Sequence, residues 1–421
     1  MWCAVRRRPR LSISKLRIAF IYRGDLRHRT ANRVSMLQNI AAAKRLGHEV
    51  ILAIPREGMT ATQAHQELAR ALADFGLNEQ VPVKTIPRPA VQTRFRRSFD
   101  FLAALWARGG RFDLVWSREF HAADYATALG LKTIIEHHHP FNLRQWRIAR
   151  RMLHRDSFKG VAAISGVHRQ MLVREGWPEG KVVVAHSGVE LSAFAARDGV
   201  HDLRQTLCER SQPLVLYAGS LYEGKGCDQI VAAASELTHV KFVCVGGPER
   251  EAAKFRARAA SLGLTNVEFT GPVAHALIPK YLLAADILLA PFTAEGRDIA
   301  GKVIIPFSSP LKLFEYMAAQ KPIISSNIGA IPEIITHEEN GLLLTPGDVA
   351  ELVKAILRLL ADSALAARLA TNAQNDARSY SWTDRVTRIL EFACADARVQ
   401  LDDQTAKERC LAPVWKLRQG D

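Results

Sequence analysis

A glycine-rich stretch with one lysine, residues 219–226 (GSLYEGKG), has the residue types of a phosphate-binding loop. Glycines free the backbone to turn its N–H groups toward an anion, and Lys225 adds a positive charge near the start of a predicted helix. The stretch is neither G-x-x-x-x-G-K-[ST], because Gly226 stands where Ser or Thr is required, nor G-x-G-x-x-G. An ordinary turn between a strand and a helix explains these residues equally well when they are taken alone.

A second stretch, residues 308–318 (SSPLKLFEYMA), predicts a helix whose start points at an anion. Ser309 is a suitable N-cap, and Pro310 suits the first helical turn. The N–H groups of residues 310–312 would then face a phosphate, and Glu315 could accept two hydrogen bonds from vicinal hydroxyls such as those of a ribose. A capped amphipathic helix with a surface glutamate is the alternative, and it is the more common role for an isolated Glu.

Histidines and a glutamate mark two further loops. Residues 136–140 (EHHHP) end a predicted strand, where neighbouring side chains point to opposite faces and three adjacent histidines cannot converge on one metal ion. This favours a single histidine lining a cleft. Residues 329–333 (GAIPE) describe a tight loop after another strand, with Glu333 as a helix cap or a cleft residue.

Short apolar runs that alternate with helical patterns must position these residues. Helical patterns in the first half include residues 32–47, 62–76 and 142–154. The predicted strands there are 17–22, 49–55, 83–87, 113–118, 132–137, 160–165 and 181–186. Alternation of this kind predicts a parallel sheet with helices on both faces.

The pattern restarts after a polar break. Predicted strands follow at 214–220, 241–247, 267–271, 287–292, 322–326 and 341–346, with helices at 227–237, 249–263, 276–285 and 310–320. We therefore expect two doubly wound α/β domains facing each other across a cleft. The expected division is residues 1–190, a linker at 191–212, a second domain at 213–380, a helix at 381–400 that returns to the first domain, and a tail at 401–421.

Composition limits the classes of protein. The 421 residues are 48% apolar and 24% charged, which excludes a collagenous or mostly disordered chain. The formal net charge of +15 is uneven, because residues 1–200 hold 33 basic and 16 acidic side chains. Nucleic acid, an acidic membrane surface and a phosphorylated substrate are the candidate partners of that half.

The cysteines and the apolar runs bear on location. The six cysteines are scattered without a C-x-x-C pair, which suggests a reducing compartment. No apolar run approaches the ~18–20 residues of a membrane-spanning helix, and residues 18–22 are better explained as a first strand than as a signal peptide. We expect a cytoplasmic protein that touches the inner face of a membrane.

Taken in order, these stretches resemble the retaining glycosyltransferases of the GT-B fold, in the large family 4-type group. The resemblance covers about residues 17–395 and is strongest over 214–346. Each motif is weak alone, but the series is specific: GSLxxGKG, VGG, VEFxG, ADIxxxP, SPLKLFEYMA, PII, GxxxE and NGLLL. In the first half, GHEVILAIP, DLVWSRE, the EHH stretch and HSGVELSAF resemble the same group.

The resemblance implies a role for each matching position. Lys225 and the loop at Gly219 and Ser220 would hold the diphosphate of a nucleotide-sugar, with N–H groups at Pro310, Leu311 and Lys312 on the distal phosphate. Glu315 would bind the ribose, and Gly247, Gly271 and Val273 would shape the base pocket. His138 would contact the donor sugar, and Gly24 would approach the donor from the first domain. The predicted catalytic residues are His138, Lys225 and Glu315.

Two positions depart from the family pattern. Many members have Arg where this chain has Ser220, which leaves Lys225 and Lys312 to neutralise the diphosphate. The family's paired-glutamate motif places its first Glu eight residues before the second, and here Phe307 occupies that position. Glu295 or Asp298 could substitute for it, although nothing in the sequence shows this.

The family reaction needs no cofactor beyond the donor substrate. No D-x-D motif follows a suitable strand, so no metal ligand is predicted and the reaction is expected to be metal-independent. Lys225 and the helix start would stabilise charge on the leaving diphosphate. The acceptor is expected to be anionic or lipid-linked, because arginines gather at positions 94, 96 and 97 and along one helix at 144, 147, 150, 151 and 155.

Other functions remain open. A sugar-nucleotide epimerase would need further acid–base carboxylates. A basic membrane-surface binding protein explains the charge but not the motif series, and no nucleic-acid-binding motif is present. A non-catalytic GT-B scaffold is made more plausible by Phe307 and Ser220.

Overall fold

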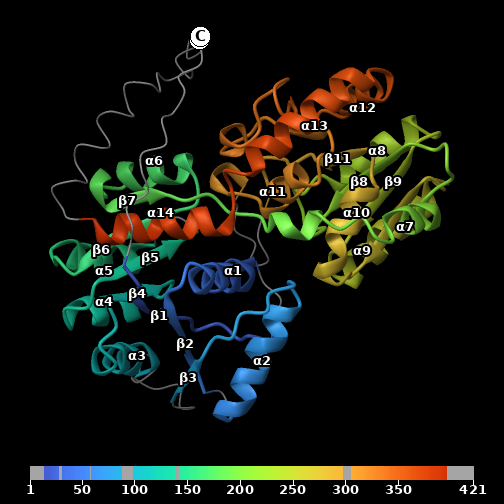
Figure 1. Cartoon of the computed structure of the whole chain (residues 1–421). Helices are drawn as coiled ribbons and strands as arrows, with labels where there is room; N and C mark the ends of the chain where they lie inside the picture. Colours follow the sequence, from blue (N-terminus) through green and yellow to red (C-terminus); the bar gives the residue numbers. More distant parts are fainter. Residues whose placement is uncertain are drawn as a thin grey trace, which may run out of the picture.

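The computed structural model describes residues 14–27, 31–56, 58–87, 98–138, 142–296 and 305–395. The arginines at 94, 96 and 97, Asp298 and residues 396–421 lie outside the described residues. The described chain forms two parallel sheets, each packed between two layers of helices (Figure 1).

The first sheet has seven strands. They are β1 (Arg17–Ile21), β2 (Glu49–Pro55), β3 (Val83–Ile86), β4 (Leu114–Ser117), β5 (Thr133–His137), β6 (Phe158–Ala163) and β7 (Val182–Val184). All neighbours pair in parallel, in the order β3-β2-β1-β4-β5-β6-β7. The chain order reverses between β1 and β4, and ligands of such sheets bind beyond the carboxyl ends of the strands at this switch point.

Helices cover both faces of the first sheet. They are α1 (Ala31–Arg45), α2 (Ala61–Ala73), α3 (Ser98–Gly109), α4 (Phe120–Ala128), α5 (Leu143–Leu153) and α6 (Gly166–Arg174), followed by the 3₁₀ turn η1 (Glu179–Lys181). α2 begins with a capping box formed by Thr60 and Gln63, and α5 begins with one formed by Asn142 and Gln145. These local signals set the helix starts.

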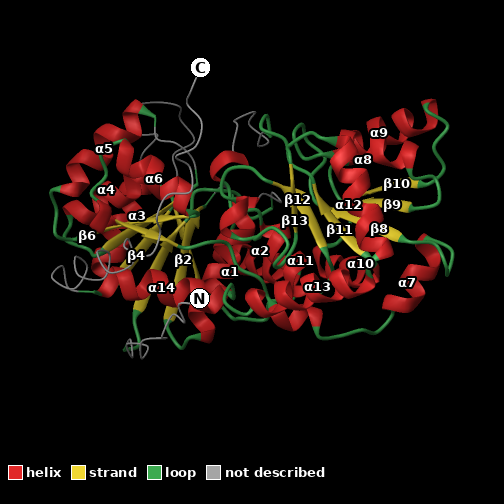
Figure 2. Cartoon of the chain, turned by 90° about the horizontal axis from the view of Figure 1, so that it is seen from above, coloured by secondary structure: helices red, strands yellow, loops and turns green. Residues whose placement is uncertain are grey.

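The second sheet repeats the same plan with six strands. They are β8 (Leu214–Ala218), β9 (Lys241–Val245), β10 (Val267–Gly271), β11 (Ile287–Ala290), β12 (Ile323–Ser326) and β13 (Leu342–Leu344). They pair in parallel in the order β10-β9-β8-β11-β12-β13, so this sheet has its switch point between β8 and β11. Figure 2 shows the two sheets side by side, each among its own helices.

The helices of the second unit include one inside the predicted linker. Residues 191–212 contain η2 (Leu191–Phe194) and α7 (Val200–Leu207), which lies against α10. The domain boundaries themselves stay a prediction. The other helices are α8 (Cys227–Glu236), α9 (Glu249–Ser261), η3 (His275–Leu277), α10 (Ile278–Ala284), η4 (Ile305–Phe307), α11 (Leu311–Ala318), η5 (Ile331–Glu333), α12 (Val349–Ala361) and α13 (Ser363–Ala377).

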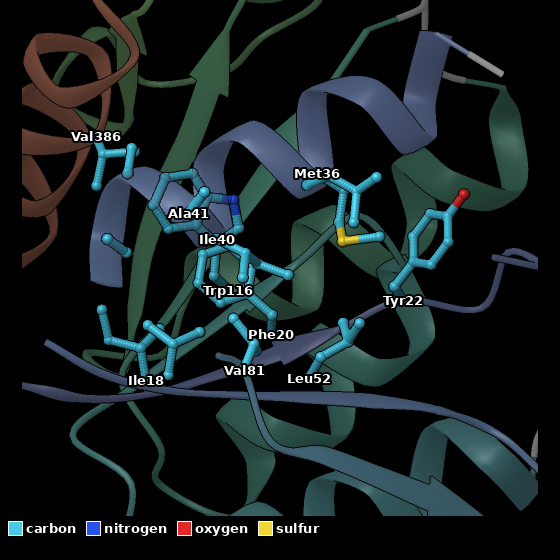
Figure 3. Packing of buried hydrophobic residues seen from close by; sticks show 14 of the residues in the cluster. Ile18, Phe20, Tyr22, Met36, Ile40, Ala41, Leu52, Val81, Trp116 and Val386 are labelled. Atoms are coloured by element: carbon cyan, nitrogen blue, oxygen red, sulfur yellow. The ribbon is translucent and has the colours of Figure 1, made fainter. Parts of the chain in front are cut away.

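The last described helix, α14 (Trp382–Cys394), packs against α1 and β6 of the first unit (Figure 1). Figure 3 shows the core that it joins, in which the rings of Phe20 and Trp116 stack 4.9 Å apart beneath Met36 and Ile40 of α1. Val386 of α14 belongs to the same buried cluster. The C-terminal helix is therefore part of the core around the first sheet.

All thirteen predicted strands are present, and most end earlier than predicted. β8, for example, was expected to run to Ser220 but ends at Ala218. The reason is Gly219, whose φ of +142° turns the chain out of the sheet.

Loops at the carboxyl ends of the two sheets contact each other. The Ser165 hydroxyl, after β6, donates to the Phe307 carbonyl over 2.7 Å. The Ser187 amide, after β7, donates to the Ser309 hydroxyl over 3.0 Å. The carboxyl ends of β6 and β7 therefore meet the loop that precedes α11 of the second unit.

Candidate functional site

The predicted phosphate loop lies at the switch point of the second sheet. It leaves β8 at Gly219 and enters α8 through Gly226, whose φ of +89° places it as a left-handed N-cap. Gly224 is left-handed as well, and a Cβ there would lie 2.2 Å from the Cα of Gly296. Backbone packing therefore requires glycine at these positions, and it brings Lys225 to the start of α8.

Lys312 reaches the same loop from α11. Its Nζ lies 3.6 Å from the centre of the Tyr217 ring and 5.4 Å from that of Phe292, while Lys225 Nζ lies 5.8 Å from the Phe292 ring. A Cβ on Gly219 would lie 2.7 Å from Lys312 Nζ. Two lysines from distant parts of the chain therefore approach one aromatic ring beside the loop.

The Lys312 ammonium is shielded from solvent and has no hydrogen-bond partner among the described residues. Burial, together with the neighbouring Lys225 ammonium, holds the pKa of Lys312 well below its usual range. An anion placed between the two lysines would supply the missing partner. The chemistry of the pair thus suits a diphosphate.

The start of α11 differs from the prediction. Pro310 is the N-cap residue, so Ser309 is not the cap, and the Ser309 hydroxyl instead accepts the Ser187 amide. Pro310 also has no N–H group, so it cannot donate to a phosphate as expected. The amides that remain for an anion are those of Leu311 and Lys312, in the first turn, where amides lack a partner within the helix.

Glu315 projects from α11 toward a histidine that the sequence analysis missed. His275 Nε2 lies 3.2 Å from Glu315 Oε1, and the His275 ring packs 4.5 Å from the ring of Phe75 in the first unit. Glu315, the residue predicted to bind the ribose, therefore lies next to the contact between His275 of the second unit and Phe75 of the first. His275 lies only two residues beyond Val273.

The residues predicted to shape the base pocket come together at the ends of β9 and β10. The Gly246 amide donates to the Gly271 carbonyl over 3.1 Å. Gly247 and Gly271 both have left-handed φ values, and a Cβ on Gly247 would lie 2.5 Å from Leu221 Cγ. Val273 is half-buried against the second core. The carbonyl of Ser220 accepts the Tyr217 hydroxyl, which fixes the loop beside these turns.

Gly24 and His138 lie on the first sheet, at the ends of β1 and β5. A Cβ on Gly24 would overlap the Tyr22 ring at 2.3 Å, so a larger residue there would have to displace that ring. His138 Nε2 lies 2.7 Å from Glu136 Oε1. Burial, together with the Arg118 guanidinium, lowers the pKa of His138 to about 3, so its ring is neutral at physiological pH.

His137 points away from His138, as expected on a strand, and meets the ring of Phe120 at 5.1 Å. In the part of the chain that the structure describes, no group of three or more His, Cys, Asp or Glu side chains is arranged to hold a metal ion.

Phe307, which departs from the family pattern, and Glu333 both lie where the two units meet. Phe307 is buried, its ring lies 5.8 Å from His168 of α6, and its carbonyl accepts the Ser165 hydroxyl. Position 307 therefore contributes to the contact between the units. Glu333, predicted as a cap or a cleft residue, accepts the amides of Gly166 and Val167 over 2.6 and 2.7 Å. It caps α6 of the other unit.

Two family models match the chain. The one described as glycosyltransferase family 4 matches residues 34–193, and the one described as glycosyl transferases group 1 matches residues 212–362. The two regions contain most of both sheets and of the candidate site. The chain belongs to glycosyltransferase family 4.

Curated relatives of this family 4 chain match it in part. The D-inositol 3-phosphate glycosyltransferase of Acidothermus cellulolyticus is 29% identical over 235 residues, which are 53% of this chain and 50% of the relative. The amylovoran biosynthesis glycosyltransferase of Erwinia amylovora is 31% identical over 205 residues, 47% of this chain and 46% of the relative. The chain spans about half the length of the curated relatives it matches.

Solved structures match over nearly the whole length. The Anabaena HepE structure in complex with UDP has a TM-score of 0.70 at 19% identity, covering 89% of this chain and 99% of that chain. A glycosyltransferase from Rickettsia africae has a TM-score of 0.71 at 19% identity, covering 93% and 100%. These matches show that the two Rossmann-like units form a GT-B fold.

Residues of the site that sequence reasoning missed come from distant segments. Tyr217 and Phe292, which flank Lys312, read as ordinary strand-end aromatics. Glu136 bonds to Ser35 and Asn39 of α1, about a hundred residues away along the chain, and pairs with Arg385 of α14, about two hundred and fifty residues away. Only the spacing of Glu136 and His138 was visible in the sequence, as two side chains on one face of a strand.

Proposed function

We propose that the chain transfers a sugar from a nucleoside-diphosphate sugar to an acceptor hydroxyl in polysaccharide or glycolipid assembly. The observation that carries the proposal is the pair of lysines, Lys225 and Lys312, beside the phosphate loop at the switch point of the second sheet. Membership of family 4 and the fold of the UDP-bound HepE structure support it.

In this proposal the second unit holds the donor. The diphosphate lies between the two ammonium groups and accepts the amides of Leu311 and Lys312, while Glu315 accepts the ribose hydroxyls. His138 meets the sugar from the first unit. The lysines and amides neutralise the charge that develops on the leaving diphosphate, which is the role a metal ion has in other transferases.

The proposed reaction retains the configuration at the anomeric carbon, as the family resemblance implies. The bond from that carbon to the phosphate oxygen breaks, and the acceptor oxygen forms its bond on the same face. The acceptor proton moves to the leaving diphosphate. Contacts such as Ser165–Phe307 hold the two units together, which would limit attack by water.

The basic first half is proposed to meet an anionic or lipid-linked acceptor at the inner face of a membrane. Arg144, Arg147 and Arg150 are exposed on α5. Arg151 and Arg155, predicted to share a helix face with Arg144 and Arg147, bind Asp124 of α4, which reduces the free charge. No helix in the described part of the chain is long and apolar enough to cross a membrane.

The proposal is tested by incubating the purified protein with UDP-, GDP- and ADP-sugars and measuring nucleoside diphosphate release and binding. We expect one nucleotide class to bind and to be released. Lys225→Ala should weaken binding roughly ten- to hundredfold, because it removes a charged contact. Lys254→Ala, on the exposed side of α9, is the matched control. Absence of binding for every donor would contradict the proposal.

A non-catalytic scaffold is the second candidate, and the position of Phe307 favours it, because this residue replaces a glutamate of the family motif. Such a protein would bind the nucleotide without turnover. An epimerase would instead return an altered sugar on the same nucleotide, which product analysis distinguishes.

A further inference from the structure

A buried carboxylate at the end of β5 collects polar partners from several segments. Glu136 is 2% exposed and accepts the Ser35 hydroxyl over 2.9 Å and the Asn39 amide over 2.8 Å, both from α1. It also pairs with Arg118, after β4, at 3.5 Å and with Arg385 of α14 at 3.0 Å. His138 is the remaining partner.

Arg385 is fixed as firmly as the carboxylate it meets. It is 5% exposed, its Nε donates to the Asn39 side-chain oxygen over 3.1 Å, and its Nη1 donates to the His186 carbonyl over 2.8 Å. Its helix packs on α1, which carries Asn39. The C-terminal helix therefore places a guanidinium beside Glu136.

Burying these groups is costly, and apolar residues of similar volume often stabilise a core at least as well as a buried ion pair. A role in setting the state of His138 would account for them. Burial alone would raise the pKa of Glu136, but Arg385, His138 and Arg118 hold that pKa well below its usual range. The carboxylate is therefore ionised.

An ionised carboxylate only accepts hydrogen bonds. His138 Nε2, 2.7 Å from Glu136, must then carry a proton and donate it. Because the ring is neutral, Nδ1 carries no proton and presents a lone pair. The charged groups that face His138 are Arg118, Glu136 and Arg385.

We propose that Glu136 and Arg385 position His138 as a neutral ring whose Nδ1 accepts a hydrogen bond from a hydroxyl of the bound sugar. Glu136 and Arg385 are positioning residues in this arrangement. The inference rests on the proposed function, because it takes a sugar as the ligand of His138. It adds two positioning residues to the contact with the donor sugar that the family resemblance already implies for His138.

The state of His138 can be measured without substrate. Nitrogen-15 NMR of histidine-labelled protein distinguishes the two neutral tautomers and the cation, and the His138→Gln spectrum identifies the signal. In the unaltered protein, we expect the tautomer protonated at Nε2, with no titration between pH 5 and 8. A signal that is protonated at Nδ1, or that titrates near pH 6.5, would overturn the proposal.

Arg385→Met tests the part played by α14. Arg385 contributes to the low pKa of His138, so its removal should raise that pKa and bring titration into the acidic range. Hydrolysis of UDP-glucose, the probe, should then lose about three- to tenfold in kcat/KM at low pH, the value of one neutral hydrogen bond, and recover at high pH. Arg388→Met, exposed on the same helix, should change neither measurement.

Arg385→Lys keeps the charge and loses the planar fork, so it should restore the low pKa in part. If Arg385→Met does not fold, the role of Arg385 is tested by comparing the pKa of His138 in Arg385→Lys with that in the unaltered protein. An unchanged His138 signal in folded Arg385→Met would contradict the role of Arg385. Failure of every nucleotide to bind would refute the proposed function, whereas the tautomer measurement would stand.

Discussion

Lys312 gives the donor site an amino group that is buried before any ligand arrives. Its Nζ rests on the Tyr217 ring, at 3.6 Å from the ring centre, without a hydrogen-bond acceptor among the described residues. A cation over an aromatic face is stabilised, but less than by an anion in contact. The residue is therefore arranged to gain most of its stabilisation when a phosphate binds.

Proton uptake on binding is the consequence. The pKa of Lys312 is held low by burial and by Lys225, and the other groups facing it are Glu315 and the thiols of Cys227 and Cys244. A bound diphosphate favours the charged ammonium and raises this pKa, so binding should take up a proton. Affinity should then fall as pH rises above the pKa of the free protein.

Titration calorimetry in two buffers of different ionisation enthalpy measures this uptake. Lys312→Met should abolish it and weaken binding about tenfold or more. Lys225→Met should weaken binding and leave some uptake. Equal uptake in Lys312→Met and in the unaltered protein would assign the proton to another group.

The sequence predicted this site unevenly, and the reasons are local. Lys225 and Glu315 follow from motif spacing, because each lies on one short loop or helix start. Ser309 was wrongly assigned as the cap, since its hydroxyl is taken by Ser187, more than a hundred residues away. Contacts of that separation, like those of Glu136 with Arg385, depend on the packing of whole elements.

At the scale of elements, the start of α6 is held by the other unit. Its first-turn amides are satisfied by Glu333, which accepts from Gly166 and Val167, and by Ser165, which accepts from His168. A helix start capped across the boundary couples the two units, because opening them would expose these amides and strand a carboxylate.

Glu333→Ala should release this coupling. The amides of Gly166 and Val167 should exchange with deuterium about two- to thirtyfold faster, the value of one N-cap interaction. Burial raises the pKa of Glu333, so the closed contact binds a proton more tightly than an opened one, and mild acidification should not open it. Nearby His186 stays neutral, since burial and the Arg388 and Arg385 guanidinium groups lower its pKa to about 4.

Glu339→Ala, on the same loop, is the control for the exchange measurement. Unchanged exchange of the Gly166 and Val167 amides in Glu333→Ala would show that this cap does not stabilise the contact.

The helix α14 should be required for stability of the first unit. Leu390 is fully buried in the cluster that contains Phe20 and Trp116. Leu390→Ala should lower the free energy of unfolding by about 2–5 kcal/mol, as a large-to-small change in a packed core does. Urea denaturation followed by circular dichroism measures this, and a loss below about 1 kcal/mol would mean that α14 is only loosely attached.

Elements were predicted more accurately than their partners. Alternating apolar and helical patterns located every strand, because the strands of a covered parallel sheet are nearly continuous apolar runs. The helix α7 was predicted as linker because its sequence is largely polar. The side of α7 that packs on α10 is recognised only in the folded structure. The return of α14 to the first unit joins segments at opposite ends of the chain.

For the whole molecule, the excess positive charge lies in the half that is proposed to bind the acceptor, and the half proposed to bind the donor is nearly neutral. Residues 1–200 carry a net charge of +17 and the rest of the chain −2. In the first unit, exposed arginines on α5 accompany exposed apolar side chains on α3, where Phe101 is 43% exposed and Leu105 is 40% exposed. Exposed arginines such as those on α5 suit the surface of an acidic membrane.

Vesicles test that surface. The protein should sediment with vesicles that contain anionic lipid, and less at high salt, because each basic residue adds about 1 kcal/mol near an acidic surface. Arg144→Gln with Arg147→Gln should reduce binding, whereas Lys354→Gln, exposed on α12 of the other unit, should not. Vesicle binding that does not change with salt concentration, or the absence of vesicle binding, would contradict the proposed contact with a membrane.

A crystal structure of the chain with the nucleoside diphosphate that binds most tightly tests the central claim most directly. The account predicts the diphosphate between Lys225 and Lys312, at the start of α11, with the ribose on Glu315. A diphosphate bound elsewhere, or held without either lysine, would contradict it.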